Sequence, residues 1–191
     1  MRKTGLILAG ALLLLTNVAN ANTIQGQTFL PNKQKAFNAV VYLEGGKKAA
    51  PLTKAVVDQR EMTFIPHVSV VTVGTTIEFP NNDTVFHNVY AYYQAKKFDL
   101  GMYPQGSVKR IKLDKTGVVA LLCNVHSEMS AYIMVVDTPY YAVADKDGKF
   151  HIANVPPGVY QLHVWHESGV SYVKEIEVKE KNDPLALTLK K

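Results

Sequence analysis

Hydrophobic and polar residues alternate in short runs from Thr23 onward, a pattern typical of β-strands that bury one face. The runs are rich in Val, Ile, Tyr, Phe and Thr, and they are separated by Gly, Pro, Asn and Asp, whereas helical periodicity is almost absent. Each run has about the length of an ordinary strand. In the first two thirds of the chain we expect strands at 39–43, 68–73, 76–79, 85–92, 108–113, 118–123 and 131–136. Their spacing predicts a β-sandwich or barrel.

The chain changes in character after Val136, where Asp137, Thr138 and Pro139 interrupt the pattern. A second set of strands is expected at 140–144, 150–153, 159–165, 172–178 and 185–189, with a hairpin turn at 145–148. We therefore expect two domains, 22–136 and 137–191. The segment 22–58 is ambiguous, because it can begin the first domain or supply a strand to the second.

The first residues differ from the rest of the chain. Arg2 and Lys3 precede an unbroken apolar run at 5–15, and Ala19 and Ala21 are small residues at the positions that a signal peptidase reads. This run is too short for a transmembrane helix, which needs about 20 apolar residues. We therefore expect residues 1–21 to be a Sec-type signal peptide. The mature protein is expected to be periplasmic and not membrane-spanning.

Composition narrows the possible classes of protein. The chain of 191 residues is 47% hydrophobic and 19% charged, which excludes a disordered tail and a polytopic membrane protein. Its 21 Lys and Arg against 16 Asp and Glu are scattered and form no basic stripe interleaved with aromatic residues, so we expect no nucleic-acid partner. Cys123 is the single cysteine, so no disulfide within the chain can hold the fold.

The chemically distinctive segment is the loop expected after the strand at 118–123. It places Cys123, His126 and Met129 within seven residues. A thiolate, an imidazole and a thioether are copper ligands, and blue-copper centres combine two His, one Cys and a weak axial Met. Each residue alone has an ordinary explanation as core packing. Their occurrence together at ligand spacing favours a metal site that needs a second histidine.

His87 is the preferred second histidine among the six in the chain. Period-2 counting places it on an apolar strand face that comprises Val85, His87, Val89 and Ala91. A histidine on that face can meet Cys123 in a shared core. His67 follows a proline ahead of a strand and is the weaker candidate.

Two motifs resemble the cupredoxin family: Pro-Asn-Asn-Asp at 80–83 followed by Val-Phe-His-Asn-Val at 85–89, and the Cys-x2-His-x2-Met loop at 123–129. The resemblance covers about residues 58–136, and the short loop is similar to that of amicyanin. It implies an all-β fold with a cupredoxin Greek-key β-sandwich followed by a small β-sandwich. It also implies one type 1 copper ion held by His87, Cys123, His126 and Met129. Asn88 matches a position that ties the two ligand loops together in many cupredoxins.

The segment 145–162 resembles the carboxypeptidase regulatory-like β-sandwich, which is a structural or interaction module. The His-Glu-x-x-His zinc motif of a peptidase is missing, and the Asp-x-Asp-Gly stretch lacks the spacing of an EF-hand. The combination with a cupredoxin resembles bacterial periplasmic proteins labelled methylamine-utilisation-like.

The leading interpretation is a periplasmic type 1 copper protein, not an enzyme, that carries single electrons between redox protein partners. The alternative is a copper-binding or delivery protein of the cell envelope. A third, catalytic interpretation uses the carboxylate of Glu128 as a ligand. We expect an apolar shell around the metal from Phe79, Phe86, Leu121 and Val135.

Overall fold

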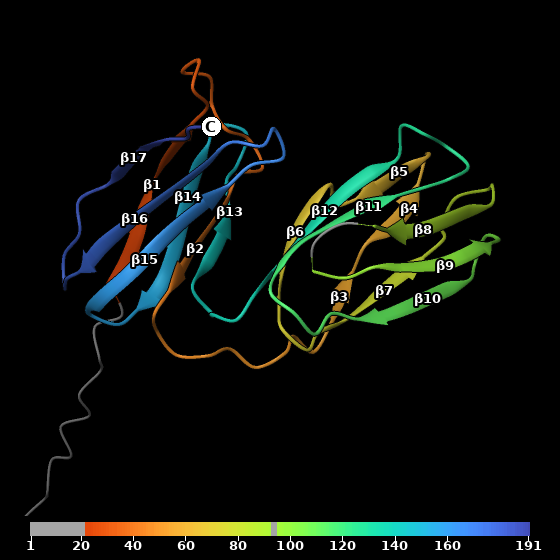
Figure 1. Cartoon of the computed structure of the whole chain (residues 1–191), viewed down its shortest axis with the longest axis horizontal. Coiled ribbons are helices and arrows are strands. Elements are labelled where there is room, and N and C mark those ends of the chain that lie inside the picture. Colours follow the sequence, from red (N-terminus) through yellow and green to blue (C-terminus); the bar gives the residue numbers. More distant parts are fainter. Residues whose placement is uncertain (1–21, 93–94) are drawn as a thin grey trace, which may run out of the picture.

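The computed structural model describes residues 22–92 and 95–191, and the expected signal peptide lies outside this part of the chain. Every regular element in the described residues is a strand, so the prediction of an all-β fold is confirmed. Figure 1 shows two β units side by side along the long axis of the molecule. Within the described residues no helix has the length and apolarity that a membrane span requires.

The first unit, here called sandwich I, contains β3 to β12. A five-stranded sheet in the order β6-β12-β11-β8-β9 faces a three-stranded sheet in the order β10-β7-β3, and β4 and β5 form a separate hairpin. Its strands are β3 (Ala55–Val56), β4 (Asp58–Arg60), β5 (Thr63–Ile65), β6 (Val68–Thr72), β7 (Thr76–Pro80), β8 (His87–Ala91), β9 (Phe98–Tyr103), β10 (Val108–Lys112), β11 (Gly117–Leu122) and β12 (Ser130–Val136). The core between the sheets includes Phe79, Val89, Leu121 and Ile133, each at most 1% exposed.

The second unit, sandwich II, combines both ends of the described chain. One sheet has the order β14-β1-β17 and the other the order β13-β2-β15-β16. Its strands are β1 (Asn22–Phe29), β2 (Val40–Glu44), β13 (Tyr141–Val143), β14 (Lys149–Val155), β15 (Gly158–Trp165), β16 (Ser171–Val178) and β17 (Leu185–Thr188). The core includes Ile24 of β1, Leu43 of β2 and Leu162 of β15.

The position of the N-terminal segment resolves the ambiguity that the sequence left open. β1 pairs with β14 and β17, and β2 pairs with β13 and β15. Residues 22–44 therefore lie in sandwich II, where Ile24 and Leu43 are buried. The physical reason is that β1 fills the centre of a three-stranded sheet, so β14 and β17 have no direct neighbour without it. Sandwich I then occupies the middle of the chain, between β2 and β13.

Two strands have buried residues on both faces and contribute to the contact between the sandwiches. In β2, Val41 and Leu43 point into sandwich II, while Val40 is buried in a second apolar layer. In β12, Ile133 points into sandwich I and Met134 into that same layer. The continuous apolar runs in these strands fit this arrangement, because a strand buried on both faces does not alternate. We call this layer the interface layer; its fully buried members are Val40, Val68, Val118, Met134 and Val136.

The expected turn at 145–148 is confirmed. The Asp145 side chain accepts hydrogen bonds from the backbone N–H groups of Asp147 (2.9 Å) and Lys149 (2.8 Å), and Gly148 has φ of 71°. A residue with a side chain is strained at this φ, and an added Cβ at Gly148 would meet the Thr28 carbonyl oxygen. The turn connects β13 to β14, but it is not the hairpin that the sequence predicted, because the two strands lie in different sheets and pair with β2 and β1 instead.

Candidate metal centre

Three of the predicted ligands converge in sandwich I. One ligand atom from each of His87, Cys123 and His126 lies within 4.8 Å of the others. His87 Nδ1 is 3.9 Å from Cys123 Sγ and 3.1 Å from His126 Nδ1. His87 is 0% and Cys123 4% exposed, and His126 is half-buried. His87 is 36 residues from Cys123 and 39 from His126 in the sequence, so only the sheet brings it to the loop.

Neighbouring strands position the two buried ligands. His87 begins β8, and Cys123 directly follows β11, which pairs with β8 in the same sheet. Within β8, His87, Val89 and Ala91 are buried, as alternation predicts. The prediction for Val85 is wrong: it lies before the strand and is 40% exposed, because the alternation has not begun at that residue.

Met129 lies at the end of the loop, with its side chain buried in the core. It is 1% exposed, belongs to the same core cluster as Cys123, and its backbone N–H donates to the His126 carbonyl at 3.0 Å. Glu128, the ligand of the catalytic alternative, is exposed on the loop. His67 lies outside the cluster, where its ring nitrogens face Ser130 and Glu167. Of these three side chains, only that of Met129 lies in the buried core with Cys123. Glu128 and His67 lie outside it.

The geometry of the cluster suits one ion. Two nitrogens that each lie about 2 Å from an ion at a near-tetrahedral angle are roughly 3.3 Å apart, and the two Nδ1 atoms are 3.1 Å apart. A buried thiol beside two imidazoles, with a thioether in the same loop, is a soft donor set of the kind that binds copper. The residues present therefore fit a copper ion.

Asp83 fixes the orientation of His87. Its Oδ2 accepts a hydrogen bond from His87 Nε2 at 2.9 Å, four residues along the chain. A carboxylate accepts here, so Nε2 carries the proton and Nδ1 presents its lone pair to Cys123 and His126. The backbone N–H of Met62, at 2.7 Å, and then the His87 ring lower the pKa of Asp83 below its ordinary value. The carboxylate is thus held ionised beside the ligand, as in carboxylate–histidine–metal arrangements.

Asn88 joins the two ligand-bearing segments, which agrees with the role that the resemblance implies. Its Oδ1 accepts from the backbone N–H of Asn124 at 2.7 Å, directly after Cys123, and its Nδ2 donates to Asp99 at 2.9 Å. Asn88 is 2% exposed, whereas its partners Asn124 and Asp99 are exposed, so both bonds are partly buried. We call the segment 123–129 the metal loop. The Asn88 side chain therefore ties the start of the metal loop to β8 and β9.

We expect Asn88→Ala to lower the free energy of unfolding of the metal-free protein by about 0.5–1.5 kcal/mol, because it removes the acceptor of the part-buried Asn124 N–H bond. Denaturant unfolding measures this change. Asn82→Ala is the matched control, since Asn82 is exposed and its amide donates only to Asp58 at the surface. Equal unfolding midpoints for the two variants would contradict a structural tie at Asn88.

A buried polar network beneath the site was not found from the sequence. Gln59 is 0% exposed and its amide donates to the Tyr103 hydroxyl and to the Pro80 carbonyl. Burial raises the pKa of Tyr103 to about 12, so its hydroxyl stays protonated and donates to the Phe79 carbonyl at 3.2 Å. Asn81, also 0% exposed, donates to the carbonyls of Val85 and Tyr103. The network fixes the segment between β7 and His87. Its members are far apart in the sequence, so no local pattern predicts that they meet.

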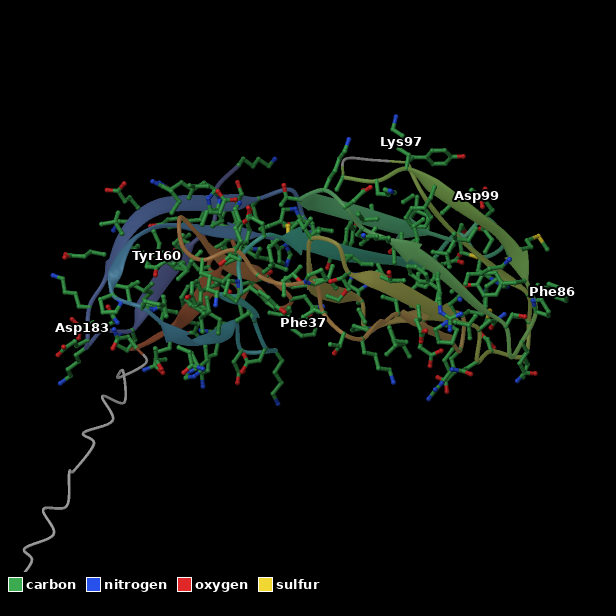
Figure 2. All side chains as sticks on the ribbon, turned by 90° about the horizontal axis from the view of Figure 1, so that it is seen from below. Phe37, Phe86, Lys97, Asp99, Tyr160 and Asp183 are labelled. Carbon is green, nitrogen blue, oxygen red and sulfur yellow. The ribbon has the colours of Figure 1, made fainter. Side chains whose placement is uncertain are left out.

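The apolar shell is smaller than expected. Phe79, Leu121 and Val135 are buried, but Phe86 is 53% exposed, so the prediction for Phe86 is wrong. Phe86 precedes β8 and points away from the core, and Figure 2 shows it projecting at the end of the molecule opposite Asp183. Exposed apolar side chains elsewhere in the segments that hold the site are Val85, Met102 and Val125.

Comparison with known proteins gives one family model. The model for polysaccharide lyase family 4, domain II, matches residues 114–184. The matched segment begins ahead of β11, includes Cys123 and His126, and ends just before β17, so it spans parts of both sandwiches. No curated protein matches.

Solved structures that resemble this chain include several cupredoxins. A purple cupredoxin from Nitrosopumilus maritimus is 20% identical, with a TM-score of 0.40, and the match covers 44% of this chain and 100% of that one. Amicyanin from Paracoccus versutus is 17% identical, with a TM-score of 0.40, over 50% of this chain and 97% of amicyanin. A copper-containing nitrite reductase from Thermus scotoductus is 25% identical, with a TM-score of 0.43; the match covers 51% of this chain and 25% of the reductase. Each of these matches covers about half of this chain.

Proposed function

We propose that this protein holds one type 1 copper ion in sandwich I and carries single electrons between redox protein partners in the periplasm, without enzymatic activity. The observation that supports it best is the buried cluster of His87, Cys123 and His126. The family resemblance of the two motifs points to the same function. Met129, in the same core, is the proposed axial ligand.

Copper supplies the chemistry by alternating between Cu(I) and Cu(II). The chain's own contribution is to hold the donor atoms in one arrangement for both states. His87 is fixed by Asp83, the start of the loop by Asn88, and Cys123 and Met129 by the core around them. Ligands held in this way move little when the charge of the ion changes, so electron exchange needs little reorganisation.

Exposure of the ligands suggests the route of the electron. His87, Cys123 and Met129 are buried, whereas His126 is half-buried on the loop. The proposed exit of the electron is therefore through the His126 ring. The exposed apolar side chains of Phe86 and Val125 lie in the two segments that carry the histidines.

The alternative proposal is copper delivery, which uses the same ligands. It predicts ready loss of Cu(I) to a competing acceptor, because a delivery site must release its metal. The carrier proposal predicts repeated reduction and oxidation with the ion retained. The buried positions of Cys123 and Met129 favour retention.

The test begins with the purified mature protein and one equivalent of Cu(II). We expect an intense visible absorption band from thiolate-to-copper charge transfer and narrow copper hyperfine splitting in the electron paramagnetic resonance spectrum. Reduction and reoxidation in the presence of a Cu(I) chelator then separates carriage from delivery. A colourless complex would overturn the type 1 assignment, and quantitative loss of copper to the chelator in the reduced state would favour delivery.

The variant Glu128→Gln tests whether the fourth ligand is the thioether of Met129 or the carboxylate of Glu128. Because Glu128 is exposed and Met129 is buried, we expect this variant to leave the visible spectrum nearly unchanged. Met129→Gln, which places an oxygen donor at the proposed axial position, is expected to shift the spectrum and lower the reduction potential. A large spectral shift in the Glu128 variant would count for the catalytic alternative.

A further inference from the structure

His67 lies between the two sandwiches and contacts both of them. It precedes β6, and its Nδ1 is 3.1 Å from the carbonyl oxygen of Ser130, the first residue of β12. Its Nε2 is 2.7 Å from a carboxylate oxygen of Glu167, in the turn between β15 and β16 of sandwich II. This histidine has no part in the metal cluster, so its contacts need another explanation.

The chemistry of the two contacts is specific. A carbonyl oxygen and a carboxylate both accept hydrogen bonds, and a neutral imidazole can donate from only one of its nitrogens. Only an imidazolium can therefore donate to both acceptors at once, and a neutral ring donates to one of them. The His67 and Glu167 side chains are 36% and 33% exposed, so water weakens the pair without removing it.

Aromatic side chains from both sandwiches hold His67 in place. The backbone N–H of Tyr132 donates to the His67 carbonyl at 2.8 Å, and the Tyr132 ring packs edge-on against the imidazole with ring centres 5.7 Å apart. On its other side Tyr132 packs against Trp165 of sandwich II, with ring centres 5.4 Å apart. Both aromatic residues border the buried interface layer. The position of His67 is thus set by the packing of the two sandwiches.

The carbonyl that His67 contacts lies directly after the metal loop. Ser130 directly follows Met129, whose backbone N–H donates to the His126 carbonyl. Asn88 fixes the beginning of this loop at Asn124, within sandwich I. The contact at Ser130 fixes its other end, and this contact reaches sandwich II through Glu167.

We propose that Glu167 is a positioning residue for the metal loop. Through His67 it holds the Ser130 carbonyl, and sandwich II thereby fixes Met129 at one side of the metal centre. The proposal gives sandwich II a role in holding the loop. The expected effect on bound copper rests on the proposed function.

The first measurement uses the metal-free protein, so that its outcome is independent of copper. We compare hydrogen exchange at the Met129 and Tyr132 amides in Glu167→Ala and in Glu44→Ala. Glu44 is a matched control, because it pairs with His163 at 3.3 Å within sandwich II. We expect exchange about 1.5- to fivefold faster in the Glu167 variant, as the loss of a partly exposed pair predicts, and no change in the control. Unchanged exchange in Glu167→Ala overturns the proposal.

Two further measurements complete the test. In a His67→Ala background, Glu167→Ala is expected to add no further change in exchange, because both residues act through one contact. In the copper-loaded protein we expect Glu167→Ala, but not Glu44→Ala, to shift the reduction potential. Faster exchange with an unchanged reduction potential would overturn the claim that holding the Ser130 carbonyl also fixes Met129 at the metal centre. Absence of a type 1 spectrum in the unmodified protein would instead reject the proposed function.

Discussion

Cys123→Ser is expected to abolish the intense visible band and the narrow copper hyperfine splitting of the loaded protein. The thiolate is the only sulfur donor of the chain that can carry a negative charge, since Cys123 is its single cysteine. A serine oxygen is a hard donor and is not ionised near neutral pH, so the strong copper–thiolate interaction is lost. Absorption and electron paramagnetic resonance spectra after one equivalent of Cu(II) measure this loss.

The same variant separates loss of the site from loss of the fold. Serine is close in size to cysteine, but its hydroxyl enters a core position that is 4% exposed, so some loss of stability is expected. Far-ultraviolet circular dichroism and the unfolding midpoint of the metal-free protein report this separately. A Cys123→Ala variant, which adds no polar group, serves as the second control. A visible band that survives both substitutions would show that Cys123 is not a ligand.

Asp83→Asn is expected to weaken Cu(II) binding by about 10–100-fold, the range typical of partners that orient a metal-bound histidine. Asp83 Oδ2 accepts from both His87 Nε2 and the Met62 N–H, and Oδ1 accepts from the Thr84 N–H. An asparagine has one acceptor oxygen, so either arrangement of its amide points an NH2 group at an N–H donor. The lost negative charge also makes the His87 ring a weaker donor, which disfavours Cu(II) more than Cu(I). The reduction potential should therefore rise.

Competition with a Cu(II) chelator and redox titration measure these two changes. Asp58→Asn is the control for loss of a carboxylate, because Asp58 bonds to Arg60, to Asn82 and to the backbone N–H of Gln59, but to none of the candidate ligands. We expect its copper affinity and potential to equal those of the unmodified protein. An unchanged potential in Asp83→Asn would mean that the carboxylate only holds the loop.

Local patterns in the sequence were sufficient for much of the fold and for the residues of the His87, Cys123 and His126 cluster. Alternation locates most of the longer strands, because the side-chain period of a strand depends only on the backbone. The strand β9 (Phe98–Tyr103) was not predicted, since Gly101 interrupts its alternation and most of its side chains are exposed or half-buried. Cys123, His126 and Met129 share one short loop, so their spacing alone indicated a common site. His87 needed only its own strand face and the family resemblance.

Tertiary structure decided what depends on residues that are distant in the chain. β1 joins β14 and β17, which lie more than a hundred positions away in the chain, and no local pattern reports this pairing. Phe86 points outward because β8 begins one residue later. Asp83 bonds to the Met62 N–H and His67 to Glu167, and both partners are distant in the sequence. The sequence by itself determined most of the strand faces and indicated the candidate ligands. The packing of the sheets determined which groups surround those candidates, because hydrogen-bond partners and burial are set by pairing between distant strands.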